Sequence, residues 1–336
     1  MQVLHIISEL SPVAGTSVFC MELCDYLMRA GIVCCVAVQQ KTAHDHESKT
    51  GVPIIVADAN FTSLPFTPDI VHIHALWNPF LHKAFLWAQR KNIPVVYSPH
   101  GMLTPWALNQ KKIKKRLALF LYQYSDLKKA ALLHATAPSE VDDIRRLKLT
   151  QPVVVAPLGV EISPRLPAVR RNNPKIVLFV SRIHPKKGLI NLVDAWGILK
   201  KKSVCEQWKC VLAGPNEDGH LNQVMAHAKT VGVVDDFEYV GPVLGETKDK
   251  LYAEADIFVL PTFSENFGSV VIEALSQGCP VITTKGAPWA ELLGGRNEDR
   301  CQKDSANERV VAGRCGWWVD IRSEERRVGK ECRSRW

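Results

Sequence analysis

The residues best suited to chemistry in this sequence are two glutamates, Glu265 and Glu273, in the segment Pro261–Gly278. A predicted strand ends at Leu260, a polar loop follows, and a helix is expected to begin near Ser269. Such a loop would present backbone N–H groups and the positive end of a helix, which suits a phosphate. Because an ionised carboxylate only accepts hydrogen bonds, both side chains are suited to hold sugar hydroxyls. A strand, loop and helix with two solvated glutamates is the alternative, and local physics alone leaves it open.

A second segment with the same layout runs from Ser181 to Leu189 and reads Ser-Arg-Ile-His-Pro-Lys-Lys-Gly-Leu. It follows a predicted strand and opens a predicted helix, about 80 residues before the first segment. Together the two segments resemble the signature of the retaining GT-B glycosyltransferases of family 4, in which Arg-x4-Lys-Gly precedes Glu-x7-Glu. The resemblance covers roughly residues 1 to 320, and its weaker matches are Pro157–Glu161, His100-Gly101 and Asp256–Pro261.

The resemblance implies a role for each matching residue. Arg182 and Lys187 are expected to bind the donor diphosphate, because two cations and a helix N-terminus would stabilise the charge that develops on the leaving group. Glu273 matches the glutamate that binds the ribose, and Glu265 matches the glutamate that faces the transferred sugar. The next residues are expected to line the donor: Asn266, Phe267 and Gly268 at the sugar, and Ser269, Val270 and Val271 at the diphosphate. Without the resemblance, the two cations would be interpreted as surface charges.

His100 lies just past the predicted strand Val95–Tyr97 and is followed by Gly101. The resemblance implies a place for His100 at the reacting centre, near the anomeric carbon and the acceptor. A neutral imidazole there could donate a hydrogen bond to a sugar hydroxyl or orient the acceptor. A loop histidine satisfied by backbone groups is the alternative. His72 and His74 share one predicted strand, and we expect them to face opposite sides of the sheet, with roles in the core or in a loop.

The first predicted strand–helix loop, Ser11–Ser17, resembles the family's Gly-Gly loop imperfectly, because Ala14 stands where the first glycine is usual. Gly15 remains an expected donor contact, since glycine lets a phosphate or an acceptor approach the backbone closely. The loop lacks the patterns of dinucleotide-binding and P-loop proteins. The sequence has no Asp-x-Asp metal motif, so we expect no metal and no cofactor, with the nucleotide sugar as a substrate.

Short β-branched runs alternate with helical patterns in two successive series. The first series predicts a helix over 17–30, ended by Gly31, and the strands Val3–Ser8, Val33–Gln39, Ile54–Ala57, Ile70–His74, Val95–Tyr97, Leu132–Ala135 and Val153–Ala156. The second predicts helices near 188–202, 219–231, 246–254 and 269–277, and the strands Ile176–Ser181, Cys210–Gly214, Phe237–Val240, Ile257–Leu260 and Val281–Thr283. Continuously apolar strands are typical of parallel sheets that are covered on both faces.

Two such series predict an α/β protein with two Rossmann-like doubly wound domains. The resemblance implies that these domains face each other across a cleft, as in the GT-B class. We expect an N-terminal acceptor-side domain at 1–160, a proline-rich linker at 161–174, a nucleotide-sugar-binding domain at 175–321 and a charged tail at 322–336. Within the second domain, the polar run 294–313 is expected to be a flexible loop. Family members usually continue with further helices, so we interpret the C-terminal end as truncated or frame-altered. A genuine disordered tail is the alternative.

Composition narrows the class of protein. Of the 336 residues, 46% are hydrophobic and 23% are charged, which excludes wholesale disorder. No apolar run is long enough for a transmembrane helix or a signal peptide. The ten cysteines include no Cys-x-x-Cys pair, so we interpret them as reduced thiols of a cytoplasmic protein. Because the net charge of +8 is modest and dispersed, no nucleic-acid partner is expected.

Basic residues do gather in Lys111–Arg116, directly before the apolar run Leu117–Tyr122 and near Trp106. This segment suits an interfacial helix on anionic lipid, which would place the protein at the inner face of the cell membrane. Lipid-linked acceptors are frequent in the family that the sequence resembles. A solvated helix start followed by a core-facing segment is the alternative, and the one that we favour.

The resemblance therefore implies a glycosyltransferase of the hexosyltransferase type. It would move a sugar from a nucleotide-diphosphate donor to a hydroxyl of a sugar or lipid-linked sugar acceptor, in polysaccharide or lipopolysaccharide biosynthesis. Retention of the anomeric configuration follows from the resemblance, and no covalent intermediate is expected because no nucleophilic carboxylate stands out. Two alternatives stay open: a pseudoenzyme that binds nucleotide sugars, and another GT-B enzyme such as a nucleotide-sugar epimerase.

Overall fold

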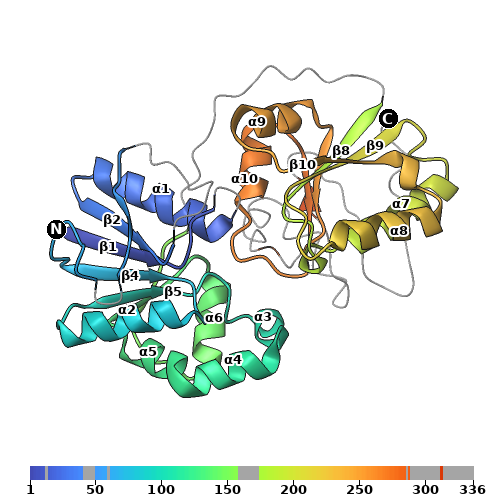
Figure 1. Ribbon diagram of the computed structural model, residues 1–336. Coiled ribbons are helices and arrows are strands. Elements are labelled where there is room, and N and C mark those ends of the chain that lie inside the picture. The colour runs from blue at the N-terminus through green and yellow to red at the C-terminus, as the bar shows by residue number, and fades with distance from the viewer. Residues whose placement is uncertain are drawn as a thin grey trace, which may run out of the picture. The chain divides into compact units, whose positions relative to one another are not determined.

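The computed structural model describes residues 1–11, 14–40, 50–58, 61–157, 174–284, 287 and, by backbone alone, 311–312. Its contacts divide the chain into two units, Met1–Gly159 and Val160–Trp336. Each unit is built on one mainly parallel sheet with helices beside it (Figure 1), so the predicted α/β class with two Rossmann-like domains is confirmed. Nearly all of the predicted linker 161–174, most of the predicted loop 294–313 and the whole tail 322–336 lie outside the described residues.

The N-terminal unit contains a seven-stranded parallel sheet in the order β3-β2-β1-β4-β5-β6-β7. Its strands are β1 Gln2–Ile7, β2 Val33–Val38, β3 Ile54–Val56, β4 Ile70–His74, β5 Val95–Ser98, β6 Leu132–Ala135 and β7 Val153–Val155. All seven match predicted strands to within one or two residues. The strand order reverses between β1 and β4, and ligands of open α/β sheets bind at the carboxyl ends of the strands beside such a reversal.

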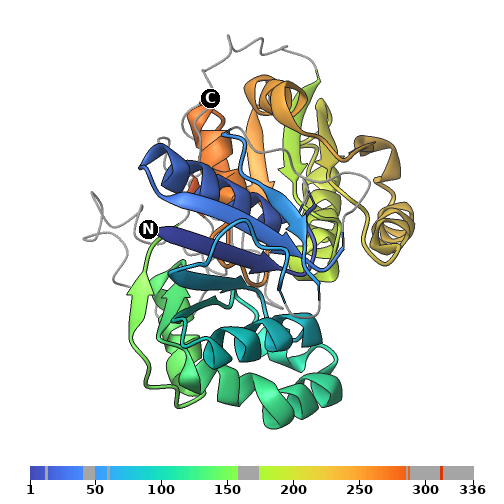
Figure 2. The same cartoon turned by 60° about the vertical axis from the view of Figure 1, so that its left-hand side comes forward.

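Successive side chains of β1 point to opposite faces of the sheet, so the core of this unit has two layers. Val3 and Ile7 pack into a cluster with residues of α1 (Gly15–Arg29), whereas Leu4 and Ile6 pack into a cluster with residues of α2 (Pro79–Arg90). The two helices therefore cover opposite faces of the sheet, as Figure 2 shows from a second direction. The other helical segments are α3 Pro105–Asn109, α4 Lys112–Ala118, η1 Leu119–Gln123, a π-helix, α5 Tyr124–Lys129 and α6 Pro138–Arg146.

The apolar run Leu117–Tyr122 corrects one expectation. We expected it to face the core, but Phe120 is 85% exposed, and Leu117 and Leu121 are also exposed. The end of the run is tied to the fold, because the Tyr122 hydroxyl donates to the carbonyl of Trp77 at 2.7 Å. Within the described residues, no helix has both the length and the apolar character needed to cross a bilayer.

The C-terminal unit contains a six-stranded sheet in the order β10-β9-β8-β11-β12-β13. Its strands are β8 Lys175–Val180, β9 Trp208–Ala213, β10 Phe237–Gly241, β11 Ile257–Leu260, β12 Val281–Thr283 and β13 Val311–Ala312. Its helices are η2 Pro185–Lys187, α7 Leu189–Lys201, α8 His220–Val231, η3 Val234–Asp236, α9 Gly245–Glu254 and α10 Ser269–Ser276. The five predicted strands are all present, and β13, which pairs antiparallel with β12, was not predicted. The order of this sheet reverses between β8 and β11.

Candidate functional site

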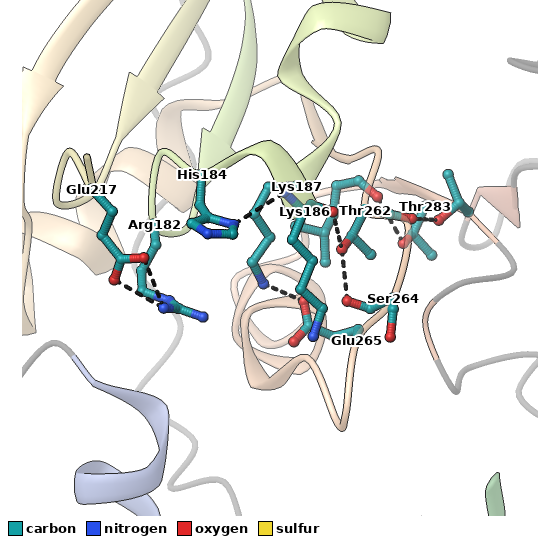
Figure 3. Close-up of polar contacts among 11 residues, drawn as sticks. Arg182, His184, Lys186, Lys187, Glu217, Thr262, Ser264, Glu265 and Thr283 are labelled. Carbon is teal, nitrogen blue, oxygen red and sulfur yellow. Dashed lines mark hydrogen bonds and ion pairs between the residues drawn. The ribbon is translucent and has the colours of Figure 1, made fainter. Parts of the chain in front are cut away.

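The two sequence motifs of the C-terminal unit form one site, because their loops follow the adjacent strands β8 and β11. The Phe263 N–H donates to the carbonyl of Lys186 at 2.9 Å, and the Thr262 hydroxyl approaches the same oxygen at 3.2 Å. Gly188 explains why the segment Ser181–Leu189 needs glycine: its φ is +68°, and an added Cβ would lie 2.0 Å from the carbonyl oxygen of Pro261. Segments about 80 residues apart in sequence are thereby held together at the carboxyl end of the sheet (Figure 3).

Lys187 and Glu265 form an ion pair at the centre of this site (Figure 3). Their side chains are only 7% and 14% exposed. Burial by itself raises the pKa of Glu265, but the charge and hydrogen bond of Lys187, with the charges of Lys186 and Arg182, bring that pKa below its ordinary value. The carboxylate is therefore ionised at neutral pH and can only accept hydrogen bonds.

Arg182 points to the same side of the loops as Lys187 (Figure 3), and its charge acts on Glu265. Its own partner is Glu217, whose two carboxylate oxygens each lie 2.9 Å from Nη1. This pair is partly exposed, at 43% and 35% of the two side chains, so it is weak and easily exchanged. Glu217 lies in the loop after β9, and sequence reasoning missed it because nothing local links it to the other motifs.

Glu273 lies on α10 and has its polar contacts with α9. It accepts a hydrogen bond from the Tyr252 hydroxyl at 3.1 Å and pairs with Lys248 at 3.0 Å. Burial, followed by the nearby charge of Glu273, raises the pKa of Tyr252 well above its ordinary value, so the phenol stays a donor. Of the four charged residues predicted to act together, the structure therefore joins Lys187 with Glu265, sets Arg182 near them and holds Glu273 through α9.

The start of α10 has the geometry expected of an anion-binding turn. Gly268 is the N-cap residue with φ +75°, a conformation that strongly favours glycine. Because its own carbonyl accepts from the Val271 N–H at 2.9 Å, the amides of Ser269 and Val270 come first at the positive end of the helix. Asn266, Ser269 and Val270 are half-buried, whereas Phe267 and Val271 are buried.

In the N-terminal unit, His100 lies just beyond the carboxyl end of β5 and has an unusual backbone conformation. Its φ is +52° and that of Gly101 is +71°. The buried Glu140, near the start of α6, holds this turn, because it accepts from the Gly101 N–H at 2.6 Å and from the Thr136 N–H at 2.8 Å. A strained non-glycine residue that the surrounding structure fixes in this way is typical of functional sites. Sequence reasoning did not identify Glu140.

His100 belongs to a cluster of imidazoles beneath the carboxyl ends of the strands. The expectation that His72 and His74 face opposite sides of the sheet is wrong: residues two apart on a strand share a face, and the two ring centroids are 4.2 Å apart. Burial lowers the pKa of His72 and His74 far below the ordinary value, and burial with the nearby His134 lowers the pKa of His100 to about 3. These three imidazoles are neutral at physiological pH.

Gly15, the remaining predicted donor contact, is the first residue of α1. An added Cβ would meet no atom within 4 Å, so the fold itself does not require glycine there. The expectation of a backbone contact with a ligand at Gly15 stays a prediction.

Two groups of described residues bring potential metal-ligating atoms within 4.8 Å of one another: His5 with Cys24 and Cys34, and His5 with His72 and His74. In the second group, Nδ1 of His5 and Nε2 of His74 are 3.0 Å apart, a normal hydrogen-bond distance. As described, His5 and His74 are therefore joined by a hydrogen bond, whereas His72 bonds to the Ser98 hydroxyl. The expectation that the protein uses no metal and no cofactor stays a prediction.

Comparison with known proteins agrees with this geometry. The family model described as "Glycosyl transferases group 1" matches residues 166–334, and the "Glycosyl transferase 4-like domain" model matches residues 14–159. Mannosylfructose-phosphate synthase of Agrobacterium fabrum is 31% identical over 37% of the chain and 28% of its own length. D-inositol 3-phosphate glycosyltransferase 2 of Catenulispora acidiphila is 27% identical over 65% of the chain and 55% of its own length. The chain thus spans about half or less of these curated relatives.

Solved structures share the fold. Sucrose-phosphate synthase from Thermosynechococcus elongatus superposes with a TM-score of 0.70 at 18% identity, over 86% of the chain and 82% of its own. HepE of Anabaena in complex with UDP-glucose superposes with a TM-score of 0.65 at 19% identity, over 87% of the chain and 82% of its own.

Proposed function

The chain belongs to the group 1 glycosyl transferases, and we propose that it transfers a sugar from a nucleotide-diphosphate donor to an acceptor hydroxyl, with retention of the anomeric configuration. One observation carries this proposal: two loops from adjacent strands bring Lys187 and Glu265 into direct contact beside the N-terminus of α10. Positive charge and a hydroxyl-accepting carboxylate thereby occur within one small site, as a phosphate-linked sugar requires.

Arg182 and Lys187 have different parts in binding the diphosphate. Because the Arg182–Glu217 pair is exposed, a phosphate can replace Glu217 at small cost and engage the guanidinium through two parallel hydrogen bonds. Lys187 is buried against Glu265, and its ammonium carries three donor hydrogens. It can therefore hold Glu265 and a phosphate oxygen at once. As the bond to the sugar breaks, both cations and the amides of Ser269 and Val270 stabilise the departing diphosphate.

The two glutamates recognise hydroxyl groups. Glu265, kept ionised by Lys187, accepts hydrogen bonds from the transferred sugar. Glu273 accepts from the ribose, while Tyr252 and Lys248 fix its orientation. The salt bridge also makes Glu265 a poor nucleophile, which supports transfer without a covalent glycosyl-enzyme intermediate. In that mechanism the departing phosphate takes the acceptor proton. Because cationic side chains neutralise the leaving group, we propose that the reaction needs no metal and no cofactor.

The N-terminal unit supplies the acceptor side of the reaction in this proposal. His100 lies just beyond the carboxyl end of β5, where α/β sheets bind ligands, and Gly15, at the start of α1, keeps its proposed contact with the donor. A half-buried neutral imidazole such as His100 can donate a hydrogen bond to a sugar hydroxyl without bringing charge. We assign the acceptor to the sugars or lipid-linked sugars of polysaccharide or lipopolysaccharide assembly, in the cytoplasm.

The surface of α4 and η1 supports peripheral binding to the inner face of the membrane. Ile113 and Phe120 are 84% and 85% exposed, and with Leu117 and Leu121 they have the spacing of one helix face. Five basic residues lie in the same segment: Lys111, Lys112, Lys114, Lys115 and Arg116. Four of them are exposed, whereas Lys115 donates to the carbonyl of Ala107 at 2.6 Å. Apolar side chains that enter the acyl layer, with cations at headgroup level, fit an anionic lipid surface. Such a surface would bring the enzyme to lipid-linked acceptors.

A thermal-shift screen of nucleotide sugars, followed by product analysis, tests the proposal. A native-state ligand raises the melting temperature, so the correct donor should stabilise the wild type and fail to stabilise the Arg182→Ala variant. Incubation with that donor and an acceptor should then release nucleoside diphosphate and a product with the donor's anomeric configuration. Conversion of the donor without acceptor would indicate an epimerase instead. Binding with neither transfer nor hydrolysis would indicate a pseudoenzyme.

A further inference from the structure

The imidazoles of the N-terminal unit form two separate hydrogen-bonded chains. In the first, Nδ1 of His5 lies 3.0 Å from Nε2 of His74, and Nδ1 of His74 lies 3.1 Å from Nε2 of His100. In the second, the Ser98 hydroxyl lies 2.7 Å from both His72 and His134, and His134 lies 2.8 Å from the carbonyl of Ala156. The first chain runs from fully buried rings to the half-buried His100.

In the second chain, the group at the end determines which atom donates in each hydrogen bond. The carbonyl of Ala156 can only accept, so Nε2 of His134 donates to it. In a neutral His134 the other nitrogen then accepts from Ser98, and the Ser98 oxygen accepts from His72. Within the described residues no hydrogen bond joins this chain to His100, although His72 lies on the same strand and the same face as His74.

The first chain has two possible directions, because the central ring of His74 is neutral and uses both nitrogens. If His100 donates to His74 and His74 donates to Nδ1 of His5, the single proton of a neutral His5 must lie on Nε2. That atom is buried and makes no hydrogen bond within the described residues. The nearby groups are the thiols of Cys24 and Cys34, and because sulfur is only a weak acceptor, an N–H there would be a poorly satisfied donor. If each ring instead donates in the direction from His5 to His100, Nε2 of His5 carries no proton. Burying that nitrogen as an unprotonated acceptor costs less than burying an N–H without a good partner.

We propose that His5 and His74 are positioning residues that hold His100 as the Nδ1–H tautomer, so that His100 donates a hydrogen bond from Nδ1 to a sugar hydroxyl. In this arrangement Nδ1–H of His5 donates to His74, and Nδ1–H of His74 donates to Nε2 of His100. The only proton of His100 then lies on Nδ1. The role of this donor rests on the proposed glycosyl transfer, but the tautomer itself does not.

The packing around His100 limits other arrangements of its ring. Phe19 of α1 is buried and contacts His100 edge-on, with ring centroids 4.9 Å apart, and it also contacts His74 and His134. The inner rings of the chain, His5 and His74, are fully buried. Glu140 fixes the backbone of the next residue, Gly101. The ring of His100 is thus held by its contacts with His74 and Phe19, and the backbone beside it is held by the hydrogen bond from Gly101 to Glu140.

Nitrogen NMR of the full chain tests the tautomer directly, because protonated and bare ring nitrogens have well separated shifts. The proposal expects His100 to carry its proton on Nδ1 in the wild type near neutral pH. In His74→Leu the donor to Nε2 is lost, and His100 should shift towards the Nε2–H form that free imidazole side chains prefer. His72→Leu is the matched control, and it should leave the tautomer of His100 unchanged. A wild-type proton on Nε2, or an unchanged tautomer in His74→Leu, would overturn the proposal.

Kinetics test the positioning role. His74→Leu should lower kcat by roughly tenfold to a hundredfold, because a small misplacement of a substrate-positioning group can cost up to about a hundredfold, with little change in the donor KM. His74→Gln should recover much of this loss, because its amide can accept from His5 and donate to His100. In a His100→Ala background, His74→Leu should have no further effect on kcat. Equal, additive losses in both backgrounds would show that His74 is merely structural.

Two further measurements keep the outcomes separate. Melting temperatures show whether each variant folds, and His74→Gln serves where His74→Leu does not. Metal analysis of the purified protein should find less than stoichiometric zinc, since one zinc per chain ligated by His5 would replace the proposed network. If the wild type shows the Nδ1–H tautomer but no sugar transfer with any donor, the proposed function fails while the hydrogen-bonded chain stands.

Discussion

Lys187→Met is the substitution that most sharply probes the buried ion pair. It removes the partner of Glu265 and leaves a carboxylate whose side chain is only 14% exposed. Breaking a buried pair from one side typically costs about 3–5 kcal/mol, and the residual exposure favours the lower end. For a unit of this size, about 3 kcal/mol corresponds to a fall of roughly 6–12 °C in the melting temperature. The matched control is Lys250→Met, because both side chains of the Lys250–Glu246 pair are exposed, at 63% and 91%, and the pair should contribute less than about 1 kcal/mol.

The pH dependence of this loss follows from the sign of the pKa shift. In the wild type, Lys187 helps to hold the pKa of Glu265 below its unfolded value of about 4.3. The stabilisation is therefore fully present above that value and is lost as the pH falls through the folded pKa. Without Lys187, burial raises the pKa of Glu265, so protonation stabilises the variant at low pH and this stability is lost as the pH rises.

The assay is differential scanning calorimetry between pH 4 and pH 8. The gap in melting temperature between the wild type and Lys187→Met should be largest near neutral pH and should narrow towards pH 4. Adding Glu265→Gln to Lys187→Met removes the unpaired charge and should recover most of the loss. A gap that does not depend on pH, or a double variant no more stable than the single one, would refute the assignment of Glu265 as a buried carboxylate held by Lys187.

Three other predictions follow from particular contacts. Gly188→Ala should destabilise the C-terminal unit and weaken donor binding, because its Cβ would meet the carbonyl of Pro261. Gly15→Ala should leave the melting temperature unchanged and raise a substrate KM, because its Cβ would meet no atom. Equal melting temperatures for the two variants would contradict the packing argument. Removal of divalent metal by EDTA should leave turnover unchanged, and loss of activity that Mg²⁺ restores would disprove a purely cationic site. Replacing Ile113 and Phe120 by serine should abolish cosedimentation with phosphatidylglycerol vesicles in low salt, as should neutralising the five basic residues, with phosphatidylcholine vesicles as the control. Binding that survives both sets of changes would exclude this surface as the membrane contact.

The elements of the fold could be predicted because each strand is a short apolar run bounded by turn residues or a helix. Strands Ile70–His74, Leu132–Ala135, Ile257–Leu260 and Val281–Thr283 have the predicted bounds. The strand order could not be predicted, because pairing depends on contacts between distant segments. Leu117–Tyr122 was misassigned to the core because its apolar residues resemble a buried helix face, and local pattern does not reveal whether another element covers that face.

The candidate site could be predicted where its residues lie within one motif and could not where partners come from elsewhere. Lys187 and Glu265 each stand in a recognisable loop, and β8 and β11 bring those loops together. Glu217 and Glu140 have no local signature, since their importance comes from the groups that they contact across the fold. The histidine network was missed for the same reason.

Calorimetric titration with nucleoside diphosphates tests the central claim most directly, namely that the loops after β8 and β11 bind the donor diphosphate. UDP, GDP and ADP would each be titrated into the wild type and into the Lys187→Met/Glu265→Gln double variant, which should retain its fold. The account predicts that one of them binds the wild type and that the double variant binds it at least tenfold more weakly. Equal affinity in the two proteins would contradict it.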